Sequence, residues 1–205
     1  MKRRNFIKTT AAGTLAFMLP SPSSAFAPGK KLRVAQVGLG SMGLNDLKDI
    51  ASHPAVEIVA LCDVDANALN TVKTKYANAK TFSDYREMFK SIGGEIDAVV
   101  VSTPDHAHAP VALKAMEMNK NVYCQKPLTH YISESRKMDA VAAQKKLVTQ
   151  MGIQVHSFYD YKLATILIQK GIIGKVKKVI AWSPKVWGYD GPAPEGSDPV
   201  PEGLN

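Results

Sequence analysis

The sequence predicts an α/β fold with a doubly wound parallel sheet, and three observations lead to that prediction. Short apolar runs of strand length alternate with longer segments that have the periodicity of amphipathic helices. A glycine-rich turn follows the first apolar run, within residues 31–43. An acidic residue, Asp63, ends the second apolar run. This combination is typical of a Rossmann-type sheet that binds a dinucleotide.

The glycine-rich turn has the spacing G-x-G-x-x-G, and each glycine has its own physical task. Gly38 allows the tight turn out of the strand, and Gly40 lets a pyrophosphate approach the backbone. Gly43 allows close packing of the next helix, which we expect to begin near Ser41 with its N–H groups aimed at the phosphates. The expected phosphate-binding residues are Gly38, Leu39, Gly40, Ser41, Met42 and Gly43.

Asp63 lies 20 positions after Gly43, where an acid can accept both hydroxyls of an adenosine ribose and repel a 2′-phosphate. Val64 and Asp65 follow, so no cation stands next to Asp63 to bind that phosphate. The sequence therefore predicts NAD rather than NADP. The alternative is that Asp63 or Asp65 only caps the next helix, and we expect Asp65 to cap and Asp63 to bind.

The other elements alternate as this fold requires. The expected strands cover residues 32–37, 56–63, 80–82, 97–101, 121–124 and 147–151. The expected helices cover residues 65–76, a segment through 85–89 with Ser83 as its cap, 109–118 and 132–146. Right-handed crossovers then give the strand order 3-2-1-4-5-6, with the ligand at the carboxyl ends of strands one and four.

The pattern changes after residue 151. A helix is expected from about residue 157 to 169 and a strand over 176–182, and eight of the eighteen residues in 188–205 are Gly or Pro. We therefore divide the chain into a signal peptide at 1–27, a dinucleotide-binding domain at 28–151 and the start of a second, open-sheet α/β domain at 152–205.

Residues 1–27 have the features of a signal peptide. A basic start is followed by a small apolar stretch at 11–19 and by Ala25-Phe26-Ala27, an A-x-A cleavage signature. The apolar stretch is about half of what a membrane span requires, so no stable membrane association is expected after cleavage. Arg3-Arg4 within RRNFIK resembles the twin-arginine signal, whose pathway carries folded proteins, and this predicts a periplasmic or otherwise exported protein.

The charge excludes one class of partner. Removal of 1–27 lowers the formal charge from +8 to +4, because it leaves 22 Lys and Arg against 18 Asp and Glu. The remaining lysines are scattered and no basic run is interleaved with aromatic residues, so no nucleic acid is expected as a partner.

The cysteines and histidines predict neither a disulfide nor a metal site. Cys62 and Cys124 end strands that the expected order separates by three spacings, about 14 Å. A disulfide needs Cα atoms within about 7 Å, so two separate buried thiols are expected. Asp105, His106 and His108 offer only two alternating imidazoles in one loop, which is a weak pattern for a metal site.

With Gln125-Lys126-Pro127 after the fifth strand, these motifs resemble the glucose–fructose oxidoreductase and inositol dehydrogenase (Gfo/Idh/MocA) family. The resemblance covers residues 31 to about 187 and includes the Thr103-Pro104 loop and His108. It implies a Rossmann domain followed by an open-sheet domain that holds the substrate. The family motif is usually Glu-Lys-Pro, and Gln125 at the first position resembles the exported bacterial branch.

The resemblance also implies roles for individual residues. Lys126, at the end of strand five, would reach both the nicotinamide and the substrate hydroxyl, as an electrostatic stabiliser or in a proton relay. The alternative is a solvated lysine in a turn. The loop with Thr103, Pro104 and His106 would lie over the nicotinamide ribose. For His156 two readings remain open, a residue facing the substrate cleft or a cap of the helix that follows.

The function implied is an NAD-dependent oxidoreductase acting on a sugar or cyclitol hydroxyl. Two alternatives remain, a glycoside hydrolase that uses NAD transiently and a non-catalytic nucleotide- or sugar-binding protein. Family members continue well beyond Asn205, and an Asp and a His on a helix of their second domain follow that point. We therefore expect this 205-residue chain to be inactive alone, and a homo-oligomer of the full-length protein remains open.

Overall fold

The computed structural model describes residues 29–182, 191–192, 196 and 199–204, and the expected signal peptide lies outside these residues. The strands are β1 (Leu32–Val37), β2 (Val56–Cys62), β3 (Lys80–Phe82), β4 (Ala98–Val101), β5 (Asn121–Gln125) and β6 (Thr149–Gly152). The helices are α2 (Ser41–Ala51), α3 (Ala66–Lys73), α4 (Tyr85–Ile92), α5 (Asp105–Glu117), α6 (Ile132–Lys145), α7 (Gln154–Ser157) and α8 (Tyr159–Gln169), with a 3-10 turn η1 (Gly93–Glu95).

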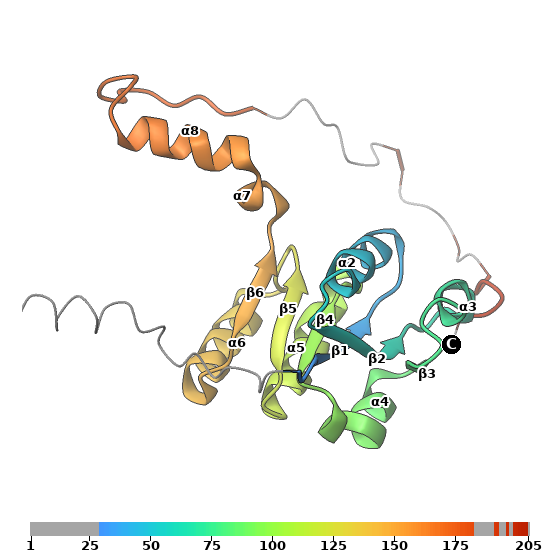
Figure 1. The fold of residues 1–205 in the computed structure, drawn as a ribbon. Helices are drawn as coiled ribbons and strands as arrows, with labels where there is room; N and C mark the ends of the chain where they lie inside the picture. The colour runs from blue at the N-terminus through green and yellow to red at the C-terminus, as the bar shows by residue number, and fades with distance from the viewer. Residues whose placement is uncertain (1–28, 183–190, 193–195, 197–198, 205) are drawn as a thin grey trace, which may run out of the picture.

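The six strands form one parallel sheet in the order β3-β2-β1-β4-β5-β6, which confirms the predicted topology (Figure 1). The chain starts in the middle of the sheet with β1, builds outward to β3, and then crosses back to β4 on the other side of β1. The carboxyl ends of β1 and β4 are thus neighbours at the point where the strand order reverses, which is where such sheets bind ligands.

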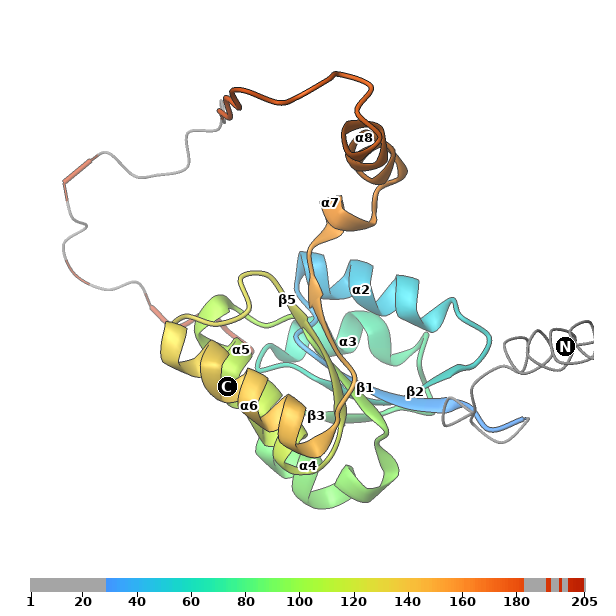
Figure 2. The same ribbon diagram turned by 90° about the vertical axis from the view of Figure 1, so that its left-hand side faces the viewer.

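Helices cover both faces of the sheet, with α2 and α3 on one face and α4, α5 and α6 on the other (Figure 2). Central strands such as β4 are apolar at successive positions because both of their faces are covered. The larger core cluster includes Val99, Val101, Phe89, Ala112 and Met116. The smaller cluster, under α2 and α3, consists of Leu39, Leu47, Leu61 and Val72.

Two helix starts differ from the sequence prediction. Helix α5 begins at Asp105, four residues before the expected start at 109, because an acidic residue suits the first turn and Pro110 is accommodated inside the helix. The cap of α4 is Asp84 and not Ser83, since the backbone N–H of Arg86 donates to the Asp84 carboxylate at 2.8 Å. The end of β4 and the start of α4 lie at the same edge of the sheet as the glycine turn.

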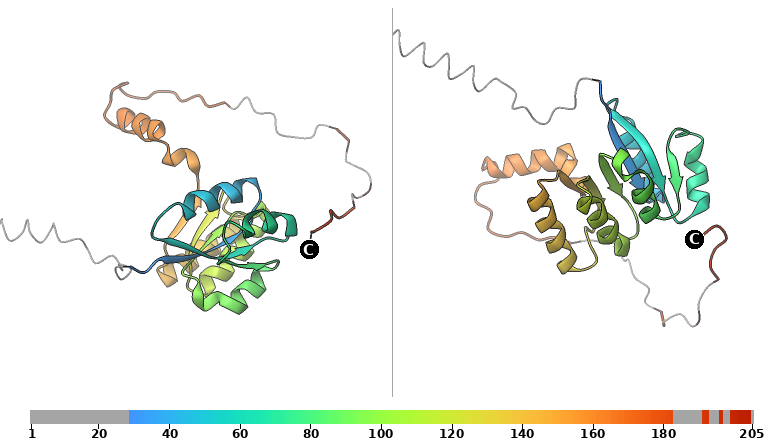
Figure 3. Two further views of the ribbon diagram at one scale, coloured as in Figure 1. Left: turned by 45° about the vertical axis from the view of Figure 1, so that its right-hand side comes forward. Right: turned by 90° about the horizontal axis from the view of Figure 1, so that it is seen from below.

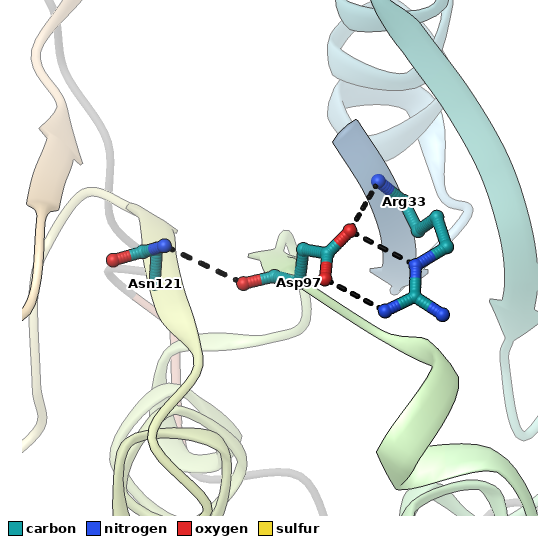
Figure 4. A network of polar contacts seen from close by, with 3 residues as sticks. All are labelled: Arg33, Asp97 and Asn121. Atoms are coloured by element: carbon teal, nitrogen blue, oxygen red, sulfur yellow. Dashed lines mark hydrogen bonds and ion pairs between the residues drawn. The ribbon is translucent and has the colours of Figure 1, made fainter. Parts of the chain in front are cut away.

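At the amino-terminal edge of the sheet, Asp97 ties β1 to β4. The Arg33 guanidinium donates to its carboxylate at 2.8 and 3.0 Å, and the Arg33 backbone N–H donates at 3.0 Å (Figure 4). The Asn121 side chain of β5 donates to the Asp97 carbonyl at 3.5 Å, which is a long hydrogen bond. The hydrogen bonds from Arg33 hold the pKa of Asp97 below its usual value.

After β6 the chain leaves the sheet, and α8 stands apart from it in Figure 1 and in the left panel of Figure 3. The helix expected from about residue 157 to 169 forms as α8 and begins two residues later, because Phe158 takes an extended conformation between α7 and α8. The strand expected over 176–182 does not form, since no described strand lies beside it to pair with its backbone. Among the helices in the described part of the chain, none has both the length and the apolar character that crossing a membrane requires.

Candidate nucleotide-binding site

A cleft of about 720 Å³ lies at the carboxyl ends of β1, β2 and β4. Its walls are the glycine turn, the end of β2, the start of α4 and the loop after β4. Its volume falls in the range of ligand sites in proteins, about 300–1,000 Å³. The sequence predicted nine of its lining residues, which are Gly38, Gly40, Ser41, Met42, Gly43, Asp63, Thr103, Pro104 and His106.

The three glycines differ in what surrounds them. Gly38 has φ +91°, and a Cβ there would collide with the carbonyl oxygen of Ser102. A Cβ at Gly43 would collide with the carbonyl oxygen of Gly38. Around Gly40 no atom of the described residues, apart from its chain neighbours, lies within 4 Å of a Cβ position, so the backbone there borders open space. Gly38 and Gly43 therefore allow the turn to form, and Gly40 keeps room for a ligand.

The amino terminus of α2 opens into this space. Gly40 is its N-cap and offers no side-chain hydrogen bond, and no acidic residue stands in the first turn. The first residues of the helix, Ser41, Met42 and Gly43, line the cleft. Free N–H groups at a helix start bind phosphate well, so the residues present fit a pyrophosphate.

Asp63 is held rigidly at the end of β2. The backbone N–H of Leu39 donates to one of its carboxylate oxygens at 2.6 Å, and the N–H of Asp65 donates to the other at 2.9 Å. Each oxygen keeps a free lone pair, as two ribose hydroxyls would require. Asp65 caps α3 by accepting from the N–H of Asn67 at 2.8 Å, which confirms its predicted role as the cap.

Two parts of this end of the cleft are far from Asp63 in sequence and were not predicted. Arg86 of α4 lines the cleft, with its guanidinium 3.3 Å from Asp84 and over the ring of Tyr85. The charge of Arg86 is paired with Asp84. The residues next to Asp63 in the sequence give no sign of this cation, because it comes from a different helix. Leu204 also lines the cleft and forms an antiparallel bridge with Asp65.

The loop after β4 forms the other end of the cleft. Thr103, Pro104 and His106 line it, and the Thr103 hydroxyl is buried without a hydrogen-bond partner among the described residues. A buried hydroxyl left unpaired is costly, and a polar group of a ligand would satisfy it. The cleft thus has an acid at one end, a phosphate-binding turn in the middle and an unsatisfied hydroxyl at the other end.

Comparison with known proteins identifies this arrangement. The sequence profile of the oxidoreductase family GFO_IDH_MocA, described as an NAD-binding Rossmann fold, matches residues 32–153, which is more than half of the chain. The chain belongs to this family. The part of the chain that carries the cleft is its NAD-binding domain, which confirms the cofactor that the sequence predicts.

Individual relatives agree with the family. The chain is 31% identical over 189 residues to a glycosyl hydrolase family 109 protein of Stenotrophomonas maltophilia, covering 86% of this chain and 40% of the relative. It is 31% identical over 147 residues to the inositol 2-dehydrogenase of Salmonella paratyphi B, covering 70% and 43%. The structure of scyllo-inositol dehydrogenase from Lactobacillus casei with bound NAD(H) and scyllo-inositol aligns with a TM-score of 0.66 at 26% identity, over 71% of this chain and 43% of that one. The chain thus spans less than half the length of these relatives.

Lys126 lies at the same edge of the sheet but not in the cleft wall. It is exposed in the turn after β5, joined to Pro127 by a cis peptide bond. The buried ring of His108 joins this turn to the loop after β4, with Nδ1 2.6 Å from the Pro127 carbonyl oxygen and Nε2 2.8 Å from that of Thr103. A neutral imidazole donates one of these hydrogen bonds, and a protonated ring donates both.

Two other predicted residues contribute differently from the prediction. Leu39 is a buried core residue whose side chain does not line the cleft, and only its backbone N–H faces the site, through Asp63. His156 caps neither α7 nor α8, because it lies inside α7 and the N-caps are Ile153 and Phe158. Its exposed ring stacks on Tyr161, with 5.2 Å between the ring centroids. The cleft wall does not include His156.

The cysteines have no chemical role in this site. Both are free and buried, and burial raises the pKa of the Cys62 and Cys124 thiols to about 12. Cys62 borders the cleft as a neutral thiol, so it is a poor nucleophile there. Within the described residues, no three His, Cys, Asp or Glu side chains gather as metal ligands would.

Proposed function

We propose that a protein with this chain and the length of its relatives is an NAD-dependent oxidoreductase acting on a hydroxyl of a sugar or cyclitol. The observation that carries the proposal is the joint position of the cleft and of Lys126, because His108 connects the Lys126 turn to the loop that lines the cleft. Relatives named as inositol dehydrogenases, one of them solved with NAD(H) and scyllo-inositol, support the substrate class.

The residues divide the work between binding and chemistry. The start of α2 holds the pyrophosphate and Asp63 holds the adenosine ribose, while Thr103 and His106 border the nicotinamide end. When bound, NAD supplies the acceptor for the hydride of the carbinol carbon. Lys126 acts on the oxygen of the same carbinol, either by stabilising its developing charge or, as a neutral amine, by taking the hydroxyl proton at Nζ.

The test is turnover in a chain extended to the length of its relatives. The purified protein is mixed with NAD and a panel of cyclitols and sugars, and the near-ultraviolet absorbance of NADH is followed. Formation of NADH with at least one cyclitol or sugar is expected. Tight NAD binding without turnover of any of them would favour the non-catalytic binding protein.

A glycoside hydrolase is the second candidate, and the relative from Stenotrophomonas maltophilia favours it because that similarity covers 86% of this chain. In that reaction a hydroxyl is oxidised, the aglycone is eliminated, water is added and the hydroxyl is reduced again. Such an enzyme releases the aglycone without net NADH. Measuring both products with a chromogenic glycoside therefore separates the two candidates.

We also propose that residues 1–27 direct export by the twin-arginine route and that 152–205 begin the substrate domain. The support is the RRNFIK stretch and the end of the sheet at β6 within the described residues. Replacing Arg3 and Arg4 together by Lys is expected to keep the protein in the cytoplasm with residues 1–27 attached. Unchanged periplasmic delivery would leave the general secretory route instead.

A further inference from the structure

Gln125, at the end of β5, is 4% exposed and its amide has both of its polar atoms engaged. Its Nε2 donates to the two carboxylate oxygens of Asp46, at 3.0 and 2.9 Å. Its Oε1 accepts from the backbone N–H of Lys126 at 3.2 Å. The opposite amide orientation would face oxygen with oxygen at Asp46 and two donors at Lys126. The two neighbours thus fix the direction of the Gln125 side chain.

Asp46, in α2, is also the end point of a second chain of hydrogen bonds. The Ser102 hydroxyl, after β4, donates to its carboxylate at 2.6 Å. Gln36 of β1 donates both to that hydroxyl, at 3.2 Å, and to the carbonyl of Gly38, at 3.0 Å. The Asp46 carboxylate therefore connects the glycine turn to the turn that carries Lys126. Asp46 is the acceptor in each of its hydrogen bonds with Ser102 and Gln125.

We propose that Asp46 and Gln125 form a matched pair that positions Lys126. The carboxylate of Asp46 holds the Gln125 amide, and the amide oxygen holds the Lys126 backbone, so the direction in which Lys126 leaves β5 depends on a residue 80 positions earlier in the chain. The role of Lys126 in catalysis rests on the proposed function, whereas the pairing itself does not.

The pairing explains why an amide stands where the family motif usually has a glutamate. A glutamate in place of Gln125 would put a second carboxylate about 3 Å from Asp46, and like charges at that distance repel strongly. The side chain at position 125 packs directly on Gly152, since a Cβ there would lie 2.8 Å from the Gln125 amide. The negative charge next to the Lys126 turn therefore comes from Asp46 of α2 and not from the residue at the end of β5.

The test is a cycle of Gln125→Glu, Asp46→Asn and the double variant in the extended protein. Gln125→Glu is expected to lower kcat by about tenfold or more, because two carboxylates then face each other. Asp46→Asn loses one hydrogen bond and is expected to lower kcat by about threefold to tenfold. In the double variant the amide introduced in α2 donates to the carboxylate introduced in β5, and its oxygen accepts from Ser102. The kcat of the double variant is therefore expected to return to within about threefold of the original.

Asp49→Asn is the matched control, because it removes the same charge from an exposed position of the same helix. It is expected to change kcat by less than about twofold. The amide proton resonance of Lys126 gives a readout that needs no turnover. It is expected to shift in both single variants and to return toward its original position in the double variant.

The outcomes separate the pairing from the proposed function. Restored resonance without cyclitol or sugar turnover in the unaltered protein would keep the pairing and reject the oxidoreductase. A double variant as impaired as the two single variants combined would overturn the pairing. A Gln125→Glu variant with unchanged kcat and an unchanged Lys126 resonance would overturn it as well.

Discussion

The two ends of the same parallel sheet are built differently. At the amino-terminal edge, Asp97 accepts three hydrogen bonds from Arg33 and closes the contact between β1 and β4. At the carboxyl edge, the start of α2 has no side-chain cap, the Thr103 hydroxyl is unpartnered and Gly40 borders open space. Completed polar contacts stabilise a fold, whereas polar groups without partners can bind a ligand. The difference assigns stability to one edge and binding to the other.

The glycine turn gives the largest expected effect, because stability and binding can be separated within it. Gly38→Ala puts a Cβ against the Ser102 carbonyl at a positive φ, so the free energy of unfolding is expected to fall by about 3 kcal/mol or more. Gly40→Ala meets no protein atom, so it should leave the unfolding free energy within about 0.5 kcal/mol and weaken NAD binding by about tenfold or more.

Denaturant unfolding and calorimetric titration with NAD measure these two effects. If Gly40→Ala destabilised the fold as much as Gly38→Ala, the open space at Gly40 would not be a ligand position. If the Gly40→Ala variant bound NAD with unchanged affinity, the pyrophosphate would not lie next to Gly40.

The acid at the end of β2 tests binding at the same edge. Asp63→Ala is expected to weaken NAD binding by about 1.5–3 kcal/mol, because hydrogen bonds to a charged group are lost, and to weaken NADP binding less or improve it. Asp65→Ala is the control, since it removes the cap of α3 at a cost of about 1 kcal/mol in stability with little effect on NAD affinity. Equal losses for NAD and NADP in Asp63→Ala would reduce Asp63 to a support for Leu39.

The amino-terminal edge gives the smallest effect, and only on stability. Asp97→Asn is expected to lower the midpoint of thermal unfolding at neutral pH and to leave NAD affinity unchanged. Because Arg33 lowers the pKa of Asp97, its stabilisation is complete above the unfolded-state pKa of about 3.9 and is lost as the pH falls further. The difference in stability between the two proteins should therefore shrink as the pH falls below about 3.9, and a constant difference on acidification would contradict the ion-pair account.

The order of the sheet was predictable from the sequence because each strand has a local signal. The run at 80–82 and the apolar runs before Gly38 and Asp63 needed no knowledge of the rest of the chain. The strand expected over 176–182 was wrong, since a strand also needs a neighbour and the described residues supply none.

The candidate site was predictable only where a motif is contiguous. The glycine turn and Asp63 follow a spacing that can be read along the sequence. The contact between Asp46 and Gln125 joins residues 79 positions apart, and the place of Arg86 in the cleft wall follows from the crossover to α4. Such contacts depend on the packing of several elements, so no local sequence pattern predicts them.

The most direct test of the central claim is Lys126→Ala in the extended protein, with kcat for the best cyclitol or sugar and the Kd for NAD measured side by side. The claim is that the cleft binds NAD and that Lys126 acts on the reacting hydroxyl without helping to bind NAD. The account predicts that kcat falls by about 10²–10⁴-fold while the Kd changes by less than about twofold. A fully active variant, or one whose activity is lost only because NAD no longer binds, would contradict it.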